Sequence, residues 1–85
     1  MKIRLRYFAS IAEQLGTRSE EIELPEGVST VAGLRAHLRA RGGTWAGVLA
    51  EGRTVRASVN LDMAQPATPL RAGDEVAFFP PVTGG

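Results

Sequence analysis

The chain contains no cysteine and only one histidine, His37, among its 85 residues. Without cysteine it cannot form a disulfide, hold an iron-sulfur cluster, build a thiolate metal site or carry a persulfide on a side chain. His37 has neither a second histidine with which to share a metal nor a thiol to activate, so we expect an ordinary surface or boundary residue. The sequence therefore predicts no metal site.

Long hydrophobic runs and an excess of one charge are also missing. No apolar stretch has the about 20 residues needed to span a bilayer, and the chain begins with a strand pattern instead of a signal sequence. Ten basic residues against nine acidic ones leave a formal charge of +1, which is too small to favour nucleic acid. We expect a soluble cytoplasmic protein with neither nucleic acid nor a membrane as its partner.

Four segments are predicted to be β-strands, and the first and third of them alternate apolar with polar residues. The four segments are residues 2–8, 19–24, 53–60 and 76–79. The proline-containing segment 66–69 is predicted to be a loop. A chain of 85 residues is just long enough to build a core without disulfides or metal, so we expect one domain.

One main helix is predicted from Ser29, as its N-cap, through Arg41. Its apolar residues Val31, Leu34 and Leu38 fall on one stripe. Shorter helical segments are predicted at residues 9–15, ended by Gly16, and at residues 45–49.

The polar residues do not converge on an enzyme site. Arg35, Arg39 and Arg41 belong to the predicted helix, where exposure to solvent explains them. Asp74 and Glu75 are adjacent at the start of a strand, where neighbouring side chains point to opposite faces. They are therefore predicted to form part of a turn and not a catalytic carboxylate pair.

Residues 78–85, FFPPVTGG, are the most informative part of the chain. The two terminal glycines have no Cβ, so the terminal carboxylate can enter a narrow channel in a partner enzyme. Pro80 and Pro81 fix φ and favour an extended path. From Val82 onward such a tail reaches about 13 Å at roughly 3.3 Å per residue. This geometry indicates a carrier that delivers a group attached to its own terminus.

Two phenylalanines beside the tail are predicted to be exposed. Parity places Phe8 on the basic face of the first strand, and Phe79 faces outward if Val76 and Phe78 face the core. If these two strands are neighbours, the pair forms an apolar docking patch rimmed by arginines.

The chain resembles the MoaD-type ubiquitin-like sulfur carriers, the small subunits of molybdopterin synthase. The resemblance covers essentially all 85 residues and rests on Tyr7-Phe8-Ala9, Thr30-Val31, Trp45-Ala46, the ASVN segment at 57–60 and the GDEVAFFPPVTGG segment at 73–85. It implies an α+β, β-grasp fold in which a mixed sheet packs on one main helix. We expect a β-grasp domain at residues 1–79 and an extended tail at residues 80–85.

The resemblance also implies a mechanism centred on Gly85. An E1-like adenylating enzyme consumes ATP to form an acyl adenylate there, and a sulfur donor protein converts the adenylate to a thiocarboxylate. The tail then enters the synthase large subunit, in a heterotetramer, and gives its sulfur to cyclic pyranopterin monophosphate to build the molybdopterin dithiolene. No permanently bound cofactor is expected. The residues that enter are Pro80, Pro81, Val82, Thr83, Gly84 and Gly85.

Phe8, Met63 and Phe79 correspond to the family's docking surface. Met63 suits a surface that binds two partners in turn, because its unbranched thioether adapts to different shapes. Arg4 and Arg6 either orient acidic partners or are simply solvated.

Three other functions are compatible with the sequence. A ubiquitin-like modifier would use the same adenylate to join Gly85 to lysines of target proteins. A sulfur carrier for thiamine or another thiolated product would serve a different acceptor. In a passive interaction domain the glycine end would have no role.

Overall fold

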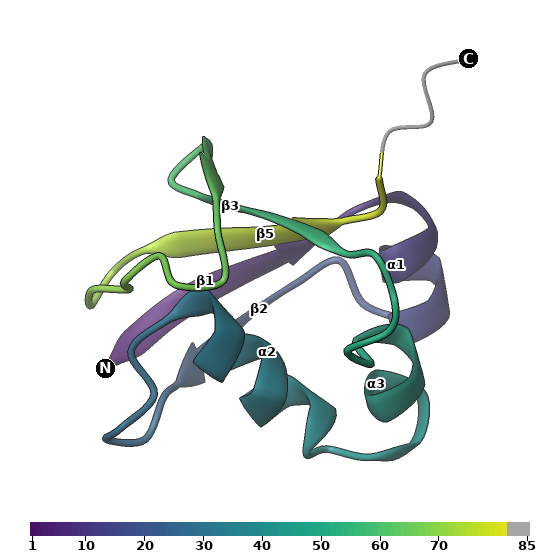
Figure 1. Ribbon diagram of the computed structural model, residues 1–85, viewed down its shortest axis with the longest axis horizontal. Coiled ribbons are helices and arrows are strands. Elements are labelled where there is room, and N and C mark those ends of the chain that lie inside the picture. The colour runs from purple at the N-terminus through teal and green to yellow at the C-terminus, as the bar shows by residue number, and fades with distance from the viewer. Residues whose placement is uncertain (82–85) are drawn as a thin grey trace.

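The computed structural model describes residues 1–81, which form a five-stranded mixed sheet and three helices (Figure 1). The strands are β1 (Lys2–Tyr7), β2 (Ser19–Glu23), β3 (Arg56–Val59), β4 (Asp62–Ala64) and β5 (Glu75–Phe79). The helices are α1 (Ala9–Leu15), α2 (Val31–Arg39) and α3 (Gly43–Val48).

The first and last strands lie side by side in the sheet, which has the order β2-β1-β5-β3-β4. β1 and β5 run parallel, whereas the other neighbours are antiparallel. The chain therefore enters at one end of the sheet and leaves at the other, as Figure 1 shows. This arrangement confirms the predicted β-grasp, α+β fold and the expectation that the first and last strands are neighbours. The first strand ends at Tyr7, one residue earlier than predicted, and Phe8 is the extended N-cap residue of α1.

The core lies between one face of the sheet and α2. β1 contributes Ile3, Leu5 and Tyr7 from alternate positions, and α2 contributes the predicted stripe of Val31, Leu34 and Leu38. From β5 the inner residues are Val76 and Phe78, which are 0% and 1% exposed. Burying these side chains removes apolar surface from water, which is the main term that stabilises so small a domain.

The boundaries of α2 differ from the prediction. Thr30, and not Ser29, is the N-cap, because its hydroxyl accepts a hydrogen bond of 3.1 Å from the backbone N–H of Gly33. The helix ends at Arg39 instead of Arg41, with Ala40 as the C-cap. α1 ends as predicted, at Gly16 in the left-handed conformation.

The predicted strand at residues 53–60 is shorter in the structure, and β4 was not predicted. β3 begins at Arg56, because residues 53–55 lie outside the paired register of the sheet. β4 is an edge strand of three residues, DMA, which is too short to show an alternating pattern. Within residues 1–81, no helix is both long enough and apolar enough to cross a membrane.

Candidate functional site: the outer face of the sheet

The outer face of the sheet is the face turned away from α2. The strand register aligns Arg6, Ala77, Ser58 and Met63 in one row across four neighbouring strands of this face. The next row, which includes Tyr7 and Phe78, lies in the core. Side chains alternate between the two faces of a strand, so the sequence alone can predict the face on which a residue lies. Only the register of the sheet shows that Met63 lies in one row with Ala77 of β5, the strand that leads into the tail.

An apolar groove runs along β5 on this face, from Glu75 to Phe79. Phe8, Leu61 and Phe79 line it, together with the small residues Ala77 and Ser58, and its volume is about 170 Å³. Ala77 and Ser58 are each 9% exposed, so the groove is floored by backbone and small side chains. Its walls are formed by larger apolar side chains.

Of the three large hydrophobic side chains exposed in residues 1–81, two line this groove, and the third, Met63, lies beside it in the register of the outer face. The exposed fractions are 44% for Phe8, 57% for Met63 and 88% for Leu61. Phe79 is half-buried. Phe8, Met63 and Phe79 were predicted to form the docking surface, and the structure places all three on the outer face. We call these three residues and Leu61 the docking face.

Sequence reasoning missed Leu61. It occupies the second position of the two-residue turn between β3 and β4, next to Asn60. Glycine is the usual residue at such a position. An apolar residue after asparagine between two short strands was the available signal, and it could not be recognised while β4 was unknown.

Positive charge borders the groove. The guanidinium of Arg6 lies 5.8 Å from the ring centroid of Phe8, within the range of a cation–π contact. Arg56 pairs with Phe79 in the strand register. Arg4 lies 4.0 Å from Glu75, a weak and exposed ion pair. A partner with acidic residues around an apolar centre would be complementary to this border.

The root of the tail lies beside Phe8. The backbone N–H of Phe8 donates a hydrogen bond of 3.1 Å to the carbonyl of Phe78, which continues the β1–β5 pairing to the end of the sheet. Pro80 is half-buried and Pro81 is exposed. The predicted insertion residues Val82, Thr83 and Gly84, and the predicted reactive residue Gly85, lie outside the described residues.

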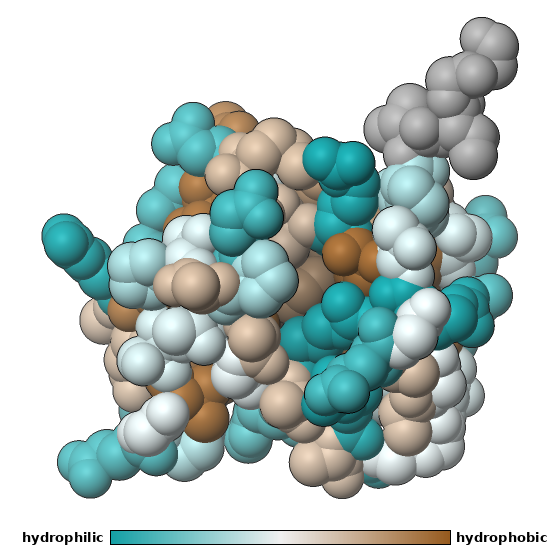
Figure 2. All heavy atoms as spheres, in the orientation of Figure 1, coloured by the Kyte–Doolittle hydropathy of each residue, from teal (hydrophilic) through white to brown (hydrophobic). Residues whose placement is uncertain are grey.

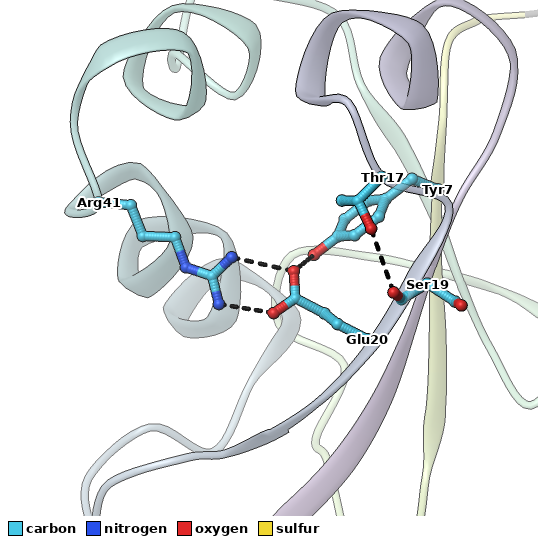
Figure 3. A network of polar contacts seen from close by, with 5 residues as sticks. All are labelled: Tyr7, Thr17, Ser19, Glu20 and Arg41. Carbon is cyan, nitrogen blue, oxygen red and sulfur yellow. Dashed lines mark hydrogen bonds and ion pairs between the residues drawn. The ribbon is translucent and has the colours of Figure 1, made fainter.

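A partly buried polar network ties β1, β2 and the turn after α2 together (Figure 3). Arg41 donates two hydrogen bonds, of 2.9 and 2.8 Å, to the Glu20 carboxylate, and the Tyr7 hydroxyl donates a third of 3.0 Å. Arg41 also lies 4.3 Å from the ring centroid of Trp45, whose ring meets Tyr7 edge-on at 5.5 Å. Arg41 is exposed, as expected, but it also has partners on segments distant in sequence, which the sequence did not predict.

The network shifts the pKa of its members in opposite directions. Burial, followed by the negative charge of Glu20, raises the pKa of Tyr7 far above its ordinary value. The hydrogen bonds from Arg41 lower the pKa of Glu20, and the hydroxyl of Tyr7 adds to the effect. Both shifts favour the arrangement of Figure 3, with a neutral phenol and a charged carboxylate.

Arg35 also has a structural role that the sequence did not predict. Its guanidinium donates hydrogen bonds to the carbonyls of Leu49 and Arg53, each at 2.8 Å, and to the carbonyl of Ala50. Burial lowers the pKa of Arg35, and the positive charge of Arg39 does so to a smaller extent. These contacts fix the segment that leads from α3 into β3.

A larger cavity of about 430 Å³ opens on the helix side, between α2 and the β3–β4 hairpin. Figure 2 views this side and shows mostly hydrophilic and neutral surface around a hollow with hydrophobic atoms at its bottom. Phe8 and Phe79 do not line this cavity, whereas Met63 and Arg56, at the edge of the outer face, also line it. Within residues 1–81, no group of three or more histidine, aspartate or glutamate side chains is arranged to hold a metal ion.

Comparison with known proteins identifies the family. The profile described as the ThiS family matches residues 5–85. The Escherichia coli protein named molybdopterin synthase sulfur carrier subunit is 42% identical, and the alignment covers 98% of this chain and 99% of that one.

Two solved structures share the fold over nearly the whole chain. One, from Pyrococcus furiosus, is described as a candidate molybdopterin converting factor, subunit 1. It is 31% identical with a TM-score of 0.78, and covers 96% of this chain and 99% of that chain. The small archaeal modifier protein 1 of Haloferax volcanii is 27% identical with a TM-score of 0.67, and covers 95% and 98%. The chain therefore belongs to the ThiS family, and within it to the molybdopterin synthase sulfur carrier subunits, as its terminal motif predicted.

Proposed function

We propose that this chain is the sulfur carrier subunit of a molybdopterin synthase and that it acts in the cytoplasm, where the ATP for its activation is available. An adenylating enzyme converts the Gly85 carboxylate to an acyl adenylate. A sulfur donor protein then displaces AMP and leaves a thiocarboxylate. The synthase large subunit receives the tail and transfers the sulfur to cyclic pyranopterin monophosphate.

The activation step follows from the chemistry of a carboxylate. A terminal carboxyl group has a pKa of about 3.5, so it is ionised at neutral pH and is a poor electrophile. The adenylate gives it a good leaving group, and replacing AMP with sulfide turns the terminus into a nucleophile. The chain itself supplies attachment and delivery, and the catalytic groups belong to its partners.

The single observation that supports this function most strongly is the docking face beside the root of the tail. Phe8 and Phe79 flank the point where the chain leaves the sheet, and Leu61 and Met63 extend the apolar surface across β3 and β4. An exposed apolar cluster with a charged rim is typical of a protein interface. The large subunit docked there would receive the tail directly.

Deleting Gly85 separates delivery from docking. We expect the shortened chain to bind the large subunit with unchanged affinity by calorimetry but to form no dithiolene product. Intact-mass analysis of the full chain, incubated with ATP, adenylating enzyme and a sulfide source, should show the mass increase of a thiocarboxylate. If the shortened chain supports product formation as well as the full chain does, the proposal is wrong.

Protein modification is the second candidate function, favoured by the similarity to the small archaeal modifier protein. In that case Gly85 would be joined to lysines of other proteins. Both functions begin with the same adenylate, so activation does not distinguish them. Lysine-linked conjugates, formed without a thiocarboxylate on the free chain, would favour the modifier.

A further inference from the structure

The chain has a single lysine, Lys2, whereas it has nine arginines. The basic positions nearest the root of the tail are arginines: Arg56 pairs with Phe79, and Arg6 pairs with Ala77. Both of these side chains border the docking face. The only side-chain amine of the protein is thus absent from the surface around the tail.

The parallel pairing of β1 and β5 places Lys2 at the opposite end of the sheet. Arg4 pairs with Glu75, so Lys2 lies two residues before this level and Phe79, the last residue of β5, lies four residues after it. At roughly 3.3 Å per residue the two levels are about 20 Å apart, and the chain turns away from the sheet after β5 (Figure 1). The four residues that follow Pro81 span at most about 14 Å. The terminal carbonyl therefore cannot reach Lys2 of its own chain.

Salt bridges also hold the two amino groups at this far end. The Lys2 ammonium lies 3.6 Å from Glu21. The amino group of Met1 lies 3.7 Å from Glu23 and donates a hydrogen bond of 3.0 Å to the carbonyl of Leu24. Figure 1 shows the N-terminus and the root of the tail on opposite sides of the molecule.

The difference between lysine and arginine matters for an activated carboxyl group. An unprotonated amine attacks the carbonyl carbon of an acyl adenylate; a C–N bond forms, the C–O bond to phosphate breaks, AMP leaves and the amine loses a proton to water. This reaction would consume the carrier irreversibly as an amide. A guanidinium has a pKa above about 12 and has no comparable free lone pair at neutral pH.

We propose that the placement of arginine around the tail, with the only lysine at the far end of the sheet, protects the activated terminus from capture by its own chain. Arg6 and Arg56 provide positive charge for docking without providing a nucleophile. This inference rests on the proposed function, because only an activated terminus needs such protection. It also predicts that amide formation between copies is confined to Lys2 and the amino group of Met1.

A chain with a chemically activated terminus tests the inference without the adenylating enzyme. The full-length protein is released from an intein fusion with a small thiol, which leaves a thioester at Gly85, and is incubated at about 10 µM. We compare the wild type with Arg56→Lys, which puts an amine beside the root of the tail. The matched control is Arg71→Lys, an exposed position just before β5, at the Lys2 end of the sheet.

An amine tethered near the tail has an effective concentration of about 1 mM, roughly a hundredfold above that of a second copy at this protein concentration. We expect Arg56→Lys to form an internal amide about a hundredfold faster than copies join, detected by mass loss and by a Gly85–residue 56 link after digestion. The wild type and Arg71→Lys should form no internal amide. The inference would be overturned if all three proteins formed equal amounts of internal amide, or if Arg56→Lys formed none. Failure of the adenylating enzyme to activate the chain would instead refute the proposed function and leave the thioester result intact.

Discussion

Asn60 and Leu61 form the two-residue turn between β3 and β4, and both have positive φ angles, 49° and 74°. Two successive residues in the left-handed region are what a type I′ hairpin turn requires, and the second is usually glycine. Asn60 tolerates this conformation, and its side chain is bonded to Asp74 and to the backbone of Glu75. Leu61 gains no such contact and is 88% exposed. From this strained, exposed leucine at the groove we infer a binding role for its side chain, which the next variant tests.

Replacing Leu61 with glycine should move stability and docking in opposite directions. Removing the left-handed penalty should raise the free energy of unfolding by about 1 kcal/mol, after the entropic cost of glycine is subtracted. Losing a leucine that is buried in the complex should weaken binding to the large subunit about tenfold. Urea denaturation and calorimetry measure the two effects.

The matched control for this change is Leu61→Met. Methionine keeps an apolar side chain and the backbone strain, so both stability and affinity should stay close to those of the wild type. An affinity of Leu61→Gly equal to that of the wild type would remove Leu61 from the docking face.

Tyr7 should make the protein sensitive to alkali. Its pKa is raised by burial and by Glu20, so above about pH 10 the unfolded chain loses the phenolic proton while the folded chain keeps it. The contribution of Tyr7 to the free energy of unfolding is fully present below about pH 10. Above that pH it falls by about 1.4 kcal/mol per pH unit. Because Tyr7 is the only tyrosine, its contribution can be isolated.

Tyr7→Phe is the variant that tests this. Phenylalanine keeps the ring but loses the hydrogen bond to Glu20, so stability at neutral pH should fall by about 1 kcal/mol. Denaturation measured from pH 8 to 11 should show a flatter dependence for this variant. Parallel pH profiles for the two proteins would contradict the assigned role of the Tyr7 hydroxyl.

Arg35 should matter more to stability than its neighbour Arg39. Arg35→Met keeps the apolar stem but removes the guanidinium that binds three loop carbonyls. These carbonyls are then hydrated or left without a partner, so the free energy of unfolding should fall by about 2 kcal/mol. Arg39→Met removes only an ion pair with the exposed Glu51 and should cost less than about 1 kcal/mol. Thermal or urea unfolding of both variants measures the difference, and equal losses would argue against the loop-fixing role.

Much of the fold could be predicted because β1 and α2 carry strong periodic patterns. Ile3, Leu5 and Tyr7 alternate, and Val31, Leu34 and Leu38 follow the helical period, so local sequence alone indicates which side of each element is buried. The outward direction of Phe8 and Phe79 follows from the same parity. These features are local, and the structure confirmed them.

The features that could not be predicted depend on partners far away in the chain. Glu20 and Arg41 meet only because β2 and the turn after α2 lie together, and Arg35 binds carbonyls fourteen to eighteen positions further on. β4 forms because β3 offers it a pairing edge, not because its three residues favour a strand. Leu61 was missed for the same reason, since its turn exists only once β4 is paired.

The groove itself can be tested by filling its floor. Ala77 points outward between Arg6 and Ser58, so Ala77→Leu places a larger side chain in the groove, beside Phe8 and Phe79, without entering the core. We expect the free energy of unfolding to change by less than about 1 kcal/mol. Binding to the large subunit should weaken at least about tenfold, because a partner side chain can no longer enter the groove. Ala32→Leu on the exposed surface of α2 is the matched control and should bind normally. If Ala77→Leu binds the large subunit as tightly as this control does, no partner side chain enters the groove. The contact would then be confined to the exposed side chains around the groove.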